Sequence, residues 1–193
     1  MWNIVYFWLK QHKSVCIIIG IIILIQLTDI NTKQWLQYNY EGVQNGEYWR
    51  LLTAHFVHLG WTHLILNIIA LLLILELATI DFTLLYTFRL ILFCGVGITL
   101  GLLIFSPETT WYVGFSGVLH GLLAVIVWQQ ICAYQGKVLL VLLIAKLVWE
   151  QCYGEFTTVD LIGSTVIIDA HLYGAIMGIL QNFSFSLKTN ISH

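Results

Sequence analysis

The chain has 193 residues, of which 59% are hydrophobic and only 9% are charged, and its formal net charge at pH 7 is −2. A soluble domain carries roughly 25% charged residues, and a soluble fold of this length could not bury so much apolar surface. The surplus of apolar side chains therefore indicates a protein that uses the lipid bilayer as its solvent. The small negative charge gives no sign of a nucleic-acid partner, and we expect none.

Six apolar runs follow one another along the chain, each near the length that a helix needs to cross the bilayer. They cover residues 14–28, 60–78, 84–105, 116–133, 137–150 and 169–187. No repeat, low-complexity tract or linker separates them, and no small-x-small cleavage site follows the first run. The sequence therefore predicts an all-α, six-span membrane bundle with a single domain over residues 1–193. The short stretch around Asp81 predicts a tight hairpin of the second and third helices.

Basic residues set the orientation of such a bundle, because cytoplasmic loops are enriched in Lys and Arg. Most of them lie in or near the termini and the even-numbered loops: Lys10, Lys13, Arg89, Lys137, Lys146 and Lys188. The odd-numbered loops hold only Lys33 and Arg50. Most of the acids gather in those odd-numbered loops: Asp29, Glu41, Glu47, Glu108, Glu150, Glu155, Asp160 and Asp169. This pattern predicts that both termini are cytoplasmic.

Polar side chains at membrane depth are costly, so they mark a protein interior or a water-filled cavity. His63 and Asn67 lie four residues apart, on one face of the second predicted helix. Ser116 and His120 stand at the start of the fourth predicted helix, and His171 at the start of the sixth. Because these three helices all begin after an odd-numbered loop, we expect all five side chains at a similar depth on the non-cytoplasmic side.

These residue types suit nucleophilic catalysis. A serine hydroxyl is a weak nucleophile that needs an adjacent base, and histidine is the usual base near neutral pH. Attack on a peptide carbonyl creates an oxyanion, for which the Ser116 amide and the side chains of His63 and Asn67 are candidate donors. Gly114 and Gly117 allow a close backbone approach on either side of the serine.

Two glycine pairs predict which helices pack together. Gly117 and Gly121 lie four residues apart on the fourth helix, and Gly174 and Gly178 have the same spacing on the sixth. Small residues at this spacing let two membrane helices approach closely. If the two pairs face each other, the serine and the histidine of these helices come within hydrogen-bond reach.

Each candidate residue also has a structural interpretation. Ser116 could cap its helix, His171 could bond to a backbone carbonyl, and His63 and Asn67 could join helices through hydrogen bonds. His120 lies one turn below Ser116, where it could stack on or bond to His171, tune the protonation of His171, or simply fill space.

The first loop, residues 29–59, is rich in aromatic side chains. It either lies partly in the membrane interface or is an ordinary loop with anchoring aromatic residues. Arg50 is expected to pack this loop through hydrogen bonds to carbonyl groups. His55 and His58 are expected to be interfacial, although His58 could line a route for water.

Taken together, these motifs resemble the rhomboid family of intramembrane serine proteases. The matching stretches are Trp49-Arg50, His63-x-x-x-Asn67, Gly114-x-Ser116-Gly117 and Ala170-His171-x-x-Gly174-x-x-x-Gly178. Each is weak alone, but together they span nearly the whole chain in the family's order. The resemblance implies that Ser116 is the nucleophile and His171 the general base of a dyad. It also implies an oxyanion hole formed by His63, Asn67 and Ser116, with no metal or cofactor.

One departure points to a branch of that family. Most rhomboids place a small or aromatic residue four positions after the serine, whereas this chain has His120 there. The string Gly-Phe-Ser-Gly-Val-Leu-His-Gly over residues 114–121 resembles the rhombosortase branch of bacterial rhomboids. The resemblance implies a multi-pass protein of the bacterial inner membrane with its active site open to the periplasmic side. Its partners would be exported, membrane-anchored substrates from which it removes Gly-Gly-type C-terminal tails that contain a hydrophobic span.

Two other classes of function compete with this interpretation. A catalytically inactive relative that binds client proteins typically lacks the serine or the histidine, and both are present here. A small transporter more often carries polar residues along a whole path, whereas here they cluster in the outer half. A metalloprotease is disfavoured because the sequence has no HExxH or comparable ligand set.

Overall fold

The computed structural model describes residues 13–79, 83–154 and 165–189, and this part of the chain is mostly helical. Its longer helices are α2 (Lys13–Gln26), α6 (Trp61–Glu76), α7 (Leu84–Phe105), α8 (Ser116–Gln129), α9 (Tyr134–Tyr153) and α11 (Asp169–Thr189). The connection between α2 and α6 holds α3 (Ile30–Leu36), β1 (Tyr38–Asn39), α4 (Tyr40–Gln44), α5 (Arg50–Thr53) and the 3₁₀-helix η1 (Ala54–Phe56). A second short strand, β2 (Trp111–Tyr112), lies between α7 and α8. The prediction of a helical bundle is thus confirmed.

The observed helix bounds agree best with the predicted ranges where the sequence is uniformly apolar. Helix α7 covers the predicted range, Leu84–Phe105, whereas α9 extends beyond the predicted run of 137–150 at both ends and covers Tyr134–Tyr153. The ends of α9 carry polar side chains, which lower the local hydropathy without breaking the helix. Glu150, assigned from the sequence to a loop, therefore lies inside α9.

Length and composition identify fewer spans than the sequence predicts. Within the described ranges, α7 alone is long and apolar enough to cross a membrane as a single straight helix. A second candidate is the bent pair formed by Arg50–Phe56 and Trp61–Glu76, whose two parts meet at 90°. Helices α2 and α8 are apolar but shorter. The prediction of six spans therefore stays a prediction.

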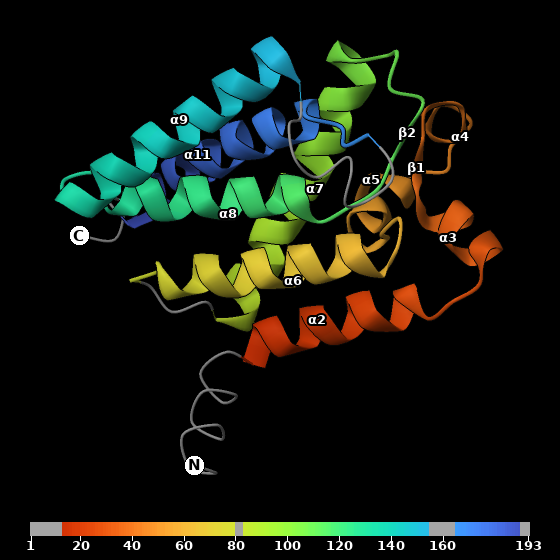
Figure 1. Cartoon of the computed structure of the whole chain (residues 1–193), viewed down its shortest axis with the longest axis horizontal. Helices are drawn as coiled ribbons and strands as arrows, with labels where there is room; N and C mark the ends of the chain where they lie inside the picture. The colour runs from red at the N-terminus through yellow and green to blue at the C-terminus, as the bar shows by residue number, and fades with distance from the viewer. Residues whose placement is uncertain (1–12, 80–82, 155–164, 190–193) are drawn as a thin grey trace.

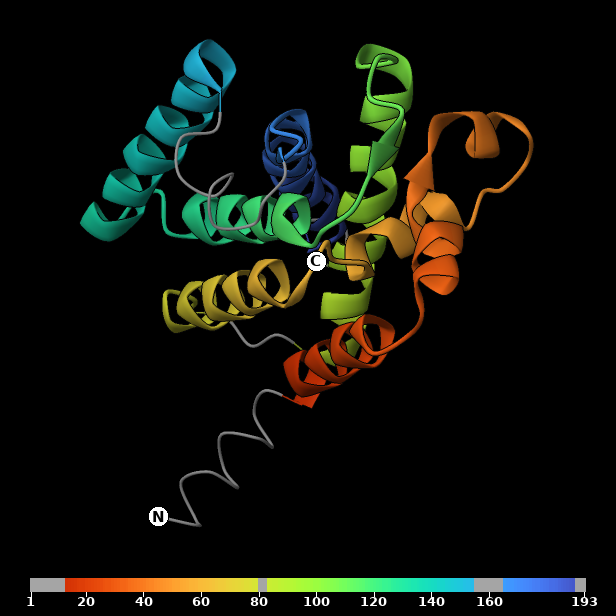
Figure 2. The same ribbon diagram turned by 45° about the vertical axis from the view of Figure 1, so that its right-hand side comes forward.

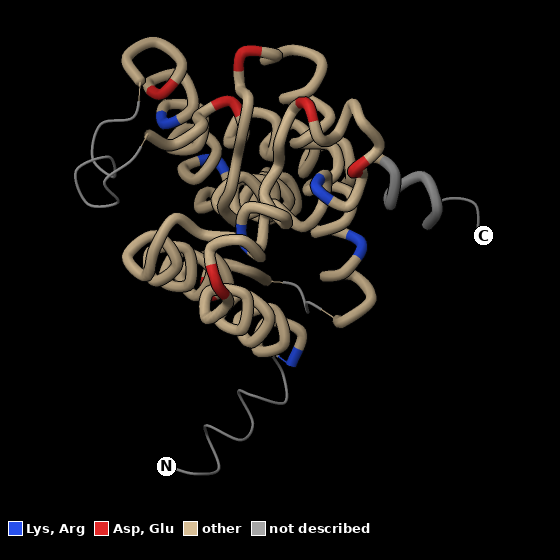
Figure 3. The backbone as a smooth tube through the Cα atoms, turned by 90° about the vertical axis from the view of Figure 1, so that its right-hand side faces the viewer, with Lys and Arg blue, Asp and Glu red and all other residues tan. Residues whose placement is uncertain are grey.

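Helix α8 lies at the centre of the bundle, in contact with α6, α7, α9 and α11 (Figure 1). Its buried residues lie all around the helix, as expected for a helix enclosed by others: Gly117, Val118, Leu119, Gly121, Leu122, Ala124, Val125, Ile126 and Val127. The outer helices instead expose apolar side chains, among them Ile17, Ile21, Leu24, Ile65, Ile69, Leu73, Val141, Ile144 and Val148. Charged residues are few along the chain (Figure 3). Such a surface suits contact with lipid.

Helices α6 and α7 do not form the predicted tight hairpin. Helix α7 crosses α6 steeply in both ribbon views (Figures 1 and 2), and Asp81 in their connection lies outside the described residues. Helix α7 packs instead on α11, where Gly97 lies against Met177 and a Cβ at Gly101 would lie 2.7 Å from the Tyr173 ring. Two glycines therefore direct this helix towards α11 rather than back along α6.

Helix α3 starts at a defined capping residue just after α2. The Asp29 carboxylate accepts hydrogen bonds from the Thr32 hydroxyl at 2.8 Å and from the amides of Asn31 and Thr32 at 2.8 and 3.1 Å. These bonds, with that from the Thr32 hydroxyl as the strongest influence, lower the pKa of Asp29. The segment that leaves α2 thus folds at once into a new element.

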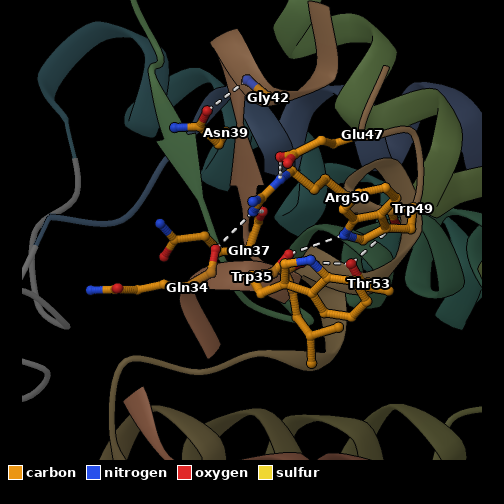
Figure 4. Close-up of polar contacts among 10 residues, drawn as sticks. Gln34, Trp35, Gln37, Asn39, Gly42, Glu47, Trp49, Arg50 and Thr53 are labelled. Atoms are coloured by element: carbon orange, nitrogen blue, oxygen red, sulfur yellow. Dashed lines mark hydrogen bonds and ion pairs between the residues drawn. The ribbon is translucent and has the colours of Figure 1, made fainter. Parts of the chain in front are cut away.

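The rest of this connection is organised around Arg50 (Figure 4). Its Nη1 donates to the carbonyls of Gln34 and Gln37, each at 2.7 Å, and its Nε donates to Glu47 at 2.5 Å. The expectation that Arg50 packs this loop through carbonyl groups is confirmed. The connection is therefore a folded unit, and we call residues 29–59 the first loop unit.

A two-stranded ladder joins the first loop unit to the segment that leads into α8. Strand β1 pairs antiparallel with β2, with Tyr38 opposite Tyr112 and Asn39 opposite Trp111. The amide of Tyr40 also donates to the carbonyl of Thr110 at 2.9 Å. Residues close in sequence to Ser116 are thus held by a segment far earlier in the chain.

Candidate active site

Ser116 and His171 meet at one end of the bundle. Ser116 is the first residue of α8, and His171 lies in the first turn of α11. The Ser116 Oγ and the His171 Nε2 are 2.9 Å apart, with the serine half-buried and the histidine buried. The N-cap of α8 is Phe115, so the helix-cap interpretation of Ser116 does not apply. The geometry allows the hydroxyl to donate to the imidazole.

Direct backbone contact between α8 and α11 brings the two residues together. Gly174 lies against the carbonyl of Gly117, and Gly178 against that of Gly121, with no room for a Cβ at either position. A Cβ on Gly117 would lie 2.8 Å from the Ala170 carbonyl oxygen, and one on Gly121 would lie 2.9 Å from that of Gly174. The prediction that the two glycine pairs face each other is confirmed.

The segment before Ser116 depends on Gly114. Its φ of +121° lies in a region that residues with a side chain rarely adopt. A Cβ here would also lie 2.8 Å from the His63 ring. The Gly114 amide donates to the Ala54 carbonyl at 3.1 Å, and its carbonyl accepts from the Tyr112 hydroxyl at 2.7 Å. The approach to the serine is thus fixed by both conformation and hydrogen bonds.

His55 and His58 lie inside the protein, so the expectation that they are interfacial is wrong. The His55 Nε2 is 2.8 Å from the Gly95 carbonyl, and its Nδ1 is 3.4 Å from the Tyr112 hydroxyl. The His58 ring packs edge-on against His63, with the ring centres 5.0 Å apart. The 90° bend between η1 and α6 turns these residues into the bundle, which hydropathy alone does not reveal.

His63 and Asn67 are both buried, and the His63 ring lies next to Gly114. The Asn67 side-chain amide donates to the His63 carbonyl at 2.8 Å, which uses one of its two N–H groups. Within the described part of the chain, the Asn67 Oδ1 and the His63 Nδ1 have no hydrogen-bond partner. Buried polar atoms without partners are uncommon. The His63 Nδ1 can donate to a bound group in one tautomer of the ring, whereas for Asn67 the predicted donor role falls to its second N–H group, because its Oδ1 can only accept.

His120 contacts both members of the serine–histidine pair. Its ring stacks on that of His171, with centres 4.1 Å apart and an angle of 18° between the planes. Its Nδ1 lies 2.8 Å from the Ser116 carbonyl, which can only accept, so this nitrogen donates. Of the alternatives that the sequence leaves open, the structure has the stacked arrangement.

Glu150 is the contact that sequence reasoning missed. Both of its carboxylate oxygens lie near the His171 Nδ1, at 3.0 and 3.1 Å, and Lys146 forms an ion pair with one of them. The residue is buried, with 6% of its surface exposed. A signal was present in the sequence, because Lys146 and Glu150 lie four residues apart in an otherwise apolar run.

A second missed group holds the first turn of α11. The Ser106 hydroxyl, just after α7, donates to the Asp169 carboxylate at 2.5 Å and lies 2.9 Å from the Tyr173 hydroxyl. Asp169 and Tyr173 flank His171 in the sequence. This group therefore ties the histidine's helical turn to the end of α7.

His120, Glu150 and His171 also present potential metal ligands within 4.8 Å of one another. Most of these atoms already have partners, because both His171 nitrogens, the His120 Nδ1 and both Glu150 oxygens make the contacts described above. His120, Glu150 and His171 therefore belong to the site around Ser116.

The fold and the site together define a helical bundle with a serine–histidine pair at one end. Residues 45–188 match the model of the Rhomboid domain, and the chain belongs to the rhomboid family. A protein of Bacillus subtilis (strain 168) named "Putative rhomboid protease YdcA" is 28% identical over 149 residues, which are 74% of this chain and 69% of that protein. Membership places the chain among integral membrane proteins of an intramembrane protease family.

Proposed function

We propose that the protein is an intramembrane serine endopeptidase in which Ser116 is the nucleophile and His171 the general base. The observation that carries this proposal is the 2.9 Å separation of the Ser116 Oγ and the His171 Nε2. A serine and a histidine in this geometry can act together as nucleophile and base. The glycine contacts between α8 and α11 hold that separation through the backbone, which favours a fixed catalytic pair.

In the proposed reaction, the Ser116 oxygen attacks the scissile carbonyl and its proton moves to the His171 Nε2. The resulting oxyanion accepts hydrogen bonds from His63, from Asn67 and from the Ser116 amide, which as a first-turn amide has no partner within α8. The imidazolium then gives its proton to the leaving amine, and water releases the acyl group from the serine. No step of this scheme requires a metal or a cofactor.

The proposed topology has α2, α6, α7, α8, α9 and α11 as six spans of one membrane domain over residues 1–193. The first turns of α6, α8 and α11 lie at the same end of the bundle (Figure 1), as alternating spans require. Lys146, counted from the sequence with the cytoplasmic basic residues, instead pairs with Glu150 at the site. The other basic residues make both termini cytoplasmic by the positive-inside rule. The site then opens on the periplasmic side of a bacterial inner membrane.

The proposed substrates are exported proteins anchored by a C-terminal hydrophobic tail with a Gly-Gly-type motif. This specificity is inferred from the resemblance of residues 114–121, including His120, to the rhombosortase branch. A helical span hides its peptide bonds, so the substrate must unwind locally before attack. Glycine near the scissile bond lowers the cost of that unwinding.

The test is co-expression with an exported protein that carries such a tail, with the new C-terminus read by mass spectrometry. We expect cleavage at or near the glycine motif by the wild-type protein. Ser116→Ala and His171→Ala should each lower the rate by at least about 10³-fold while the helical circular dichroism signal is kept. Full activity in either variant contradicts the proposal.

The two rival functions have their own signatures. If a fluorophosphonate probe does not label Ser116 in the folded wild-type protein, a client-binding role is favoured. Solute or ion flux through the purified protein in liposomes would instead indicate a transporter.

A further inference from the structure

We propose that Glu150 is a positioning residue for His171, so that the site works as a Ser116–His171–Glu150 triad. This inference rests on the proposed protease function and adds a third side chain to it. Glu150 lies near the end of α9, so the triad draws one residue from each of three helices, α8, α9 and α11.

The contact geometry fixes the state of the histidine ring. The His171 Nδ1 lies 3.0 and 3.1 Å from the two Glu150 oxygens, while its Nε2 faces the Ser116 hydroxyl. An ionised carboxylate can only accept hydrogen bonds, so Nδ1 carries the ring proton. Nε2 then presents its lone pair to Ser116, which is the tautomer that a general base requires.

The same contact stabilises the charge that forms during the reaction. When the Ser116 proton moves to the His171 Nε2, the ring becomes a cation next to the Glu150 carboxylate. The proton passes from Nε2 to the leaving amine, and the Nδ1 proton stays in place. Glu150 remains ionised throughout, so protons and charge balance without any further reactant.

Burial of the Glu150 carboxylate costs free energy, which its contact with His171 must offset. Its side chain is 7% exposed, and burial of a carboxylate costs several kcal/mol before compensation. Lys146 supplies part of the compensation, yet 49% of the Lys146 side chain is exposed, so this ion pair could form as readily at the surface. An ordinary ion pair on a helix surface does not explain why Glu150 points inward and places both of its carboxylate oxygens at the His171 Nδ1.

Among the described residues, Lys146 and His120 are titratable side chains that contact this pair, and His63 lies near enough to interact with the charge on His171. Lys146 pairs with one Glu150 oxygen and favours its ionised form. His120 stacks on the opposite partner, the His171 ring, and donates to the Ser116 carbonyl. Among the described contacts, neither Lys146 nor His120 offers the His171 Nδ1 an acceptor. Glu150 is therefore the acceptor of the Nδ1 proton.

The experiment compares Glu150→Gln and Glu150→Asp with the matched change Glu76→Gln, which alters an exposed acid on α6. Two quantities are measured on the full chain in detergent or liposomes: kcat and KM for a tail-bearing substrate, and the rate of Ser116 labelling by a fluorophosphonate probe. The labelling rate is normalised to the folded, monodisperse fraction, so that a variant that folds poorly loses yield rather than rate.

We expect Glu150→Gln to lower kcat by about 10²- to 10⁴-fold, with KM changed by less than about threefold. The labelling rate should fall in parallel, because the serine is less activated. Glu150→Asp keeps the charge and should recover at least about tenfold over Glu150→Gln, while Glu76→Gln stays at the wild-type level. Lys146→Met, which spares the contact with His171, should stay within about tenfold of wild type.

Two results would overturn the triad. One is a folded Glu150→Gln protein with kcat and labelling within about threefold of wild type. The other is a loss in Lys146→Met as large as in Glu150→Gln, which would make the acid only a partner of the lysine. If the wild-type protein neither cleaves nor labels, the protease function fails; if it does both and Glu150→Gln matches it, the triad alone fails.

Discussion

Two regions hold Ser116 in position, and they do so by opposite physical means. The interface of α8 and α11 is a contact of backbones, in which glycines meet carbonyl groups with no side chain between them. The first loop unit is held by directed hydrogen bonds, with Arg50 at its centre. The α8–α11 interface requires glycines, which have no side chain, whereas the first loop unit requires the guanidinium group of Arg50.

This difference determines what each region tolerates. A close-packed contact cannot accept an added methyl group without moving the backbone, so its failures are displacements of the site. A hydrogen-bonded unit fails when a buried acceptor loses its donor, so its failures are losses of stability. The interface thus sets the distance between Ser116 and His171, and the first loop unit keeps the folded state populated.

The largest effect is expected from Gly174→Ala, which breaks the packed interface. The new Cβ overlaps the Gly117 carbonyl, so α11 must shift and carry His171 away from Ser116. A misplacement of about 1 Å can cost about 10²-fold in rate, and overpacking adds about 1–3 kcal/mol of destabilisation. Cleavage rate and thermal unfolding in detergent measure the two effects.

The matched control is Gly20→Ala in α2, where a Cβ meets no atom within 4 Å. It should retain wild-type activity and stability, since alanine favours helix. Equal activity in the two alanine variants would show that the glycine contact does not set the separation of Ser116 and His171.

A smaller effect on activity, with a clear loss of stability, is expected from Arg50→Gln. The change leaves the Gln34 and Gln37 carbonyls and the Glu47 carboxylate without their donor. Hydrogen bonds to charged groups contribute about 1.5–3 kcal/mol, so the free energy of unfolding should fall by about that amount. The kcat of the folded fraction should change by less than about threefold, since the α8–α11 contact is intact.

Chemical unfolding measures this loss, with Arg89→Gln as the control because Arg89 is exposed on α7. If Arg50→Gln instead lowers kcat strongly at unchanged stability, the first loop unit acts on the chemistry, and the division between the two regions is wrong.

Sequence reasoning succeeded where a local pattern has one physical meaning. The apolar run of α7 gave both ends of the helix, and the glycine spacing gave the α8–α11 contact that joins Ser116 to His171. It failed where tertiary structure decides. The bend after η1 buries His55, and α7 crosses α6 instead of forming the expected hairpin. Hydropathy does not predict the direction that either segment takes.

Glu150 illustrates the limit for the candidate site. An acid at the end of an apolar run fits a loop equally well, and only the continuation of α9 to Tyr153 places it within the helix. Its partner on α11 is distant in the sequence, so no spacing rule connects them. The buried histidines His58 and His63 pose the same problem, because their contact depends on a turn of the backbone.

The smallest change in free energy is expected from His120→Phe, which sharpens the comparison inside the packed interface. Phenylalanine keeps a ring over His171 and removes only the hydrogen bond to the Ser116 carbonyl. That bond contributes about 0.5–1.5 kcal/mol, and kcat should fall by less than about tenfold because the stacked surface still orients His171. His120→Ala, which removes the ring as well, should lose more in the same cleavage assay. A fall of about 10²-fold or more in the phenylalanine variant would give His120 a part in proton transfer, and the interface would then depend on a polar group as the first loop unit does.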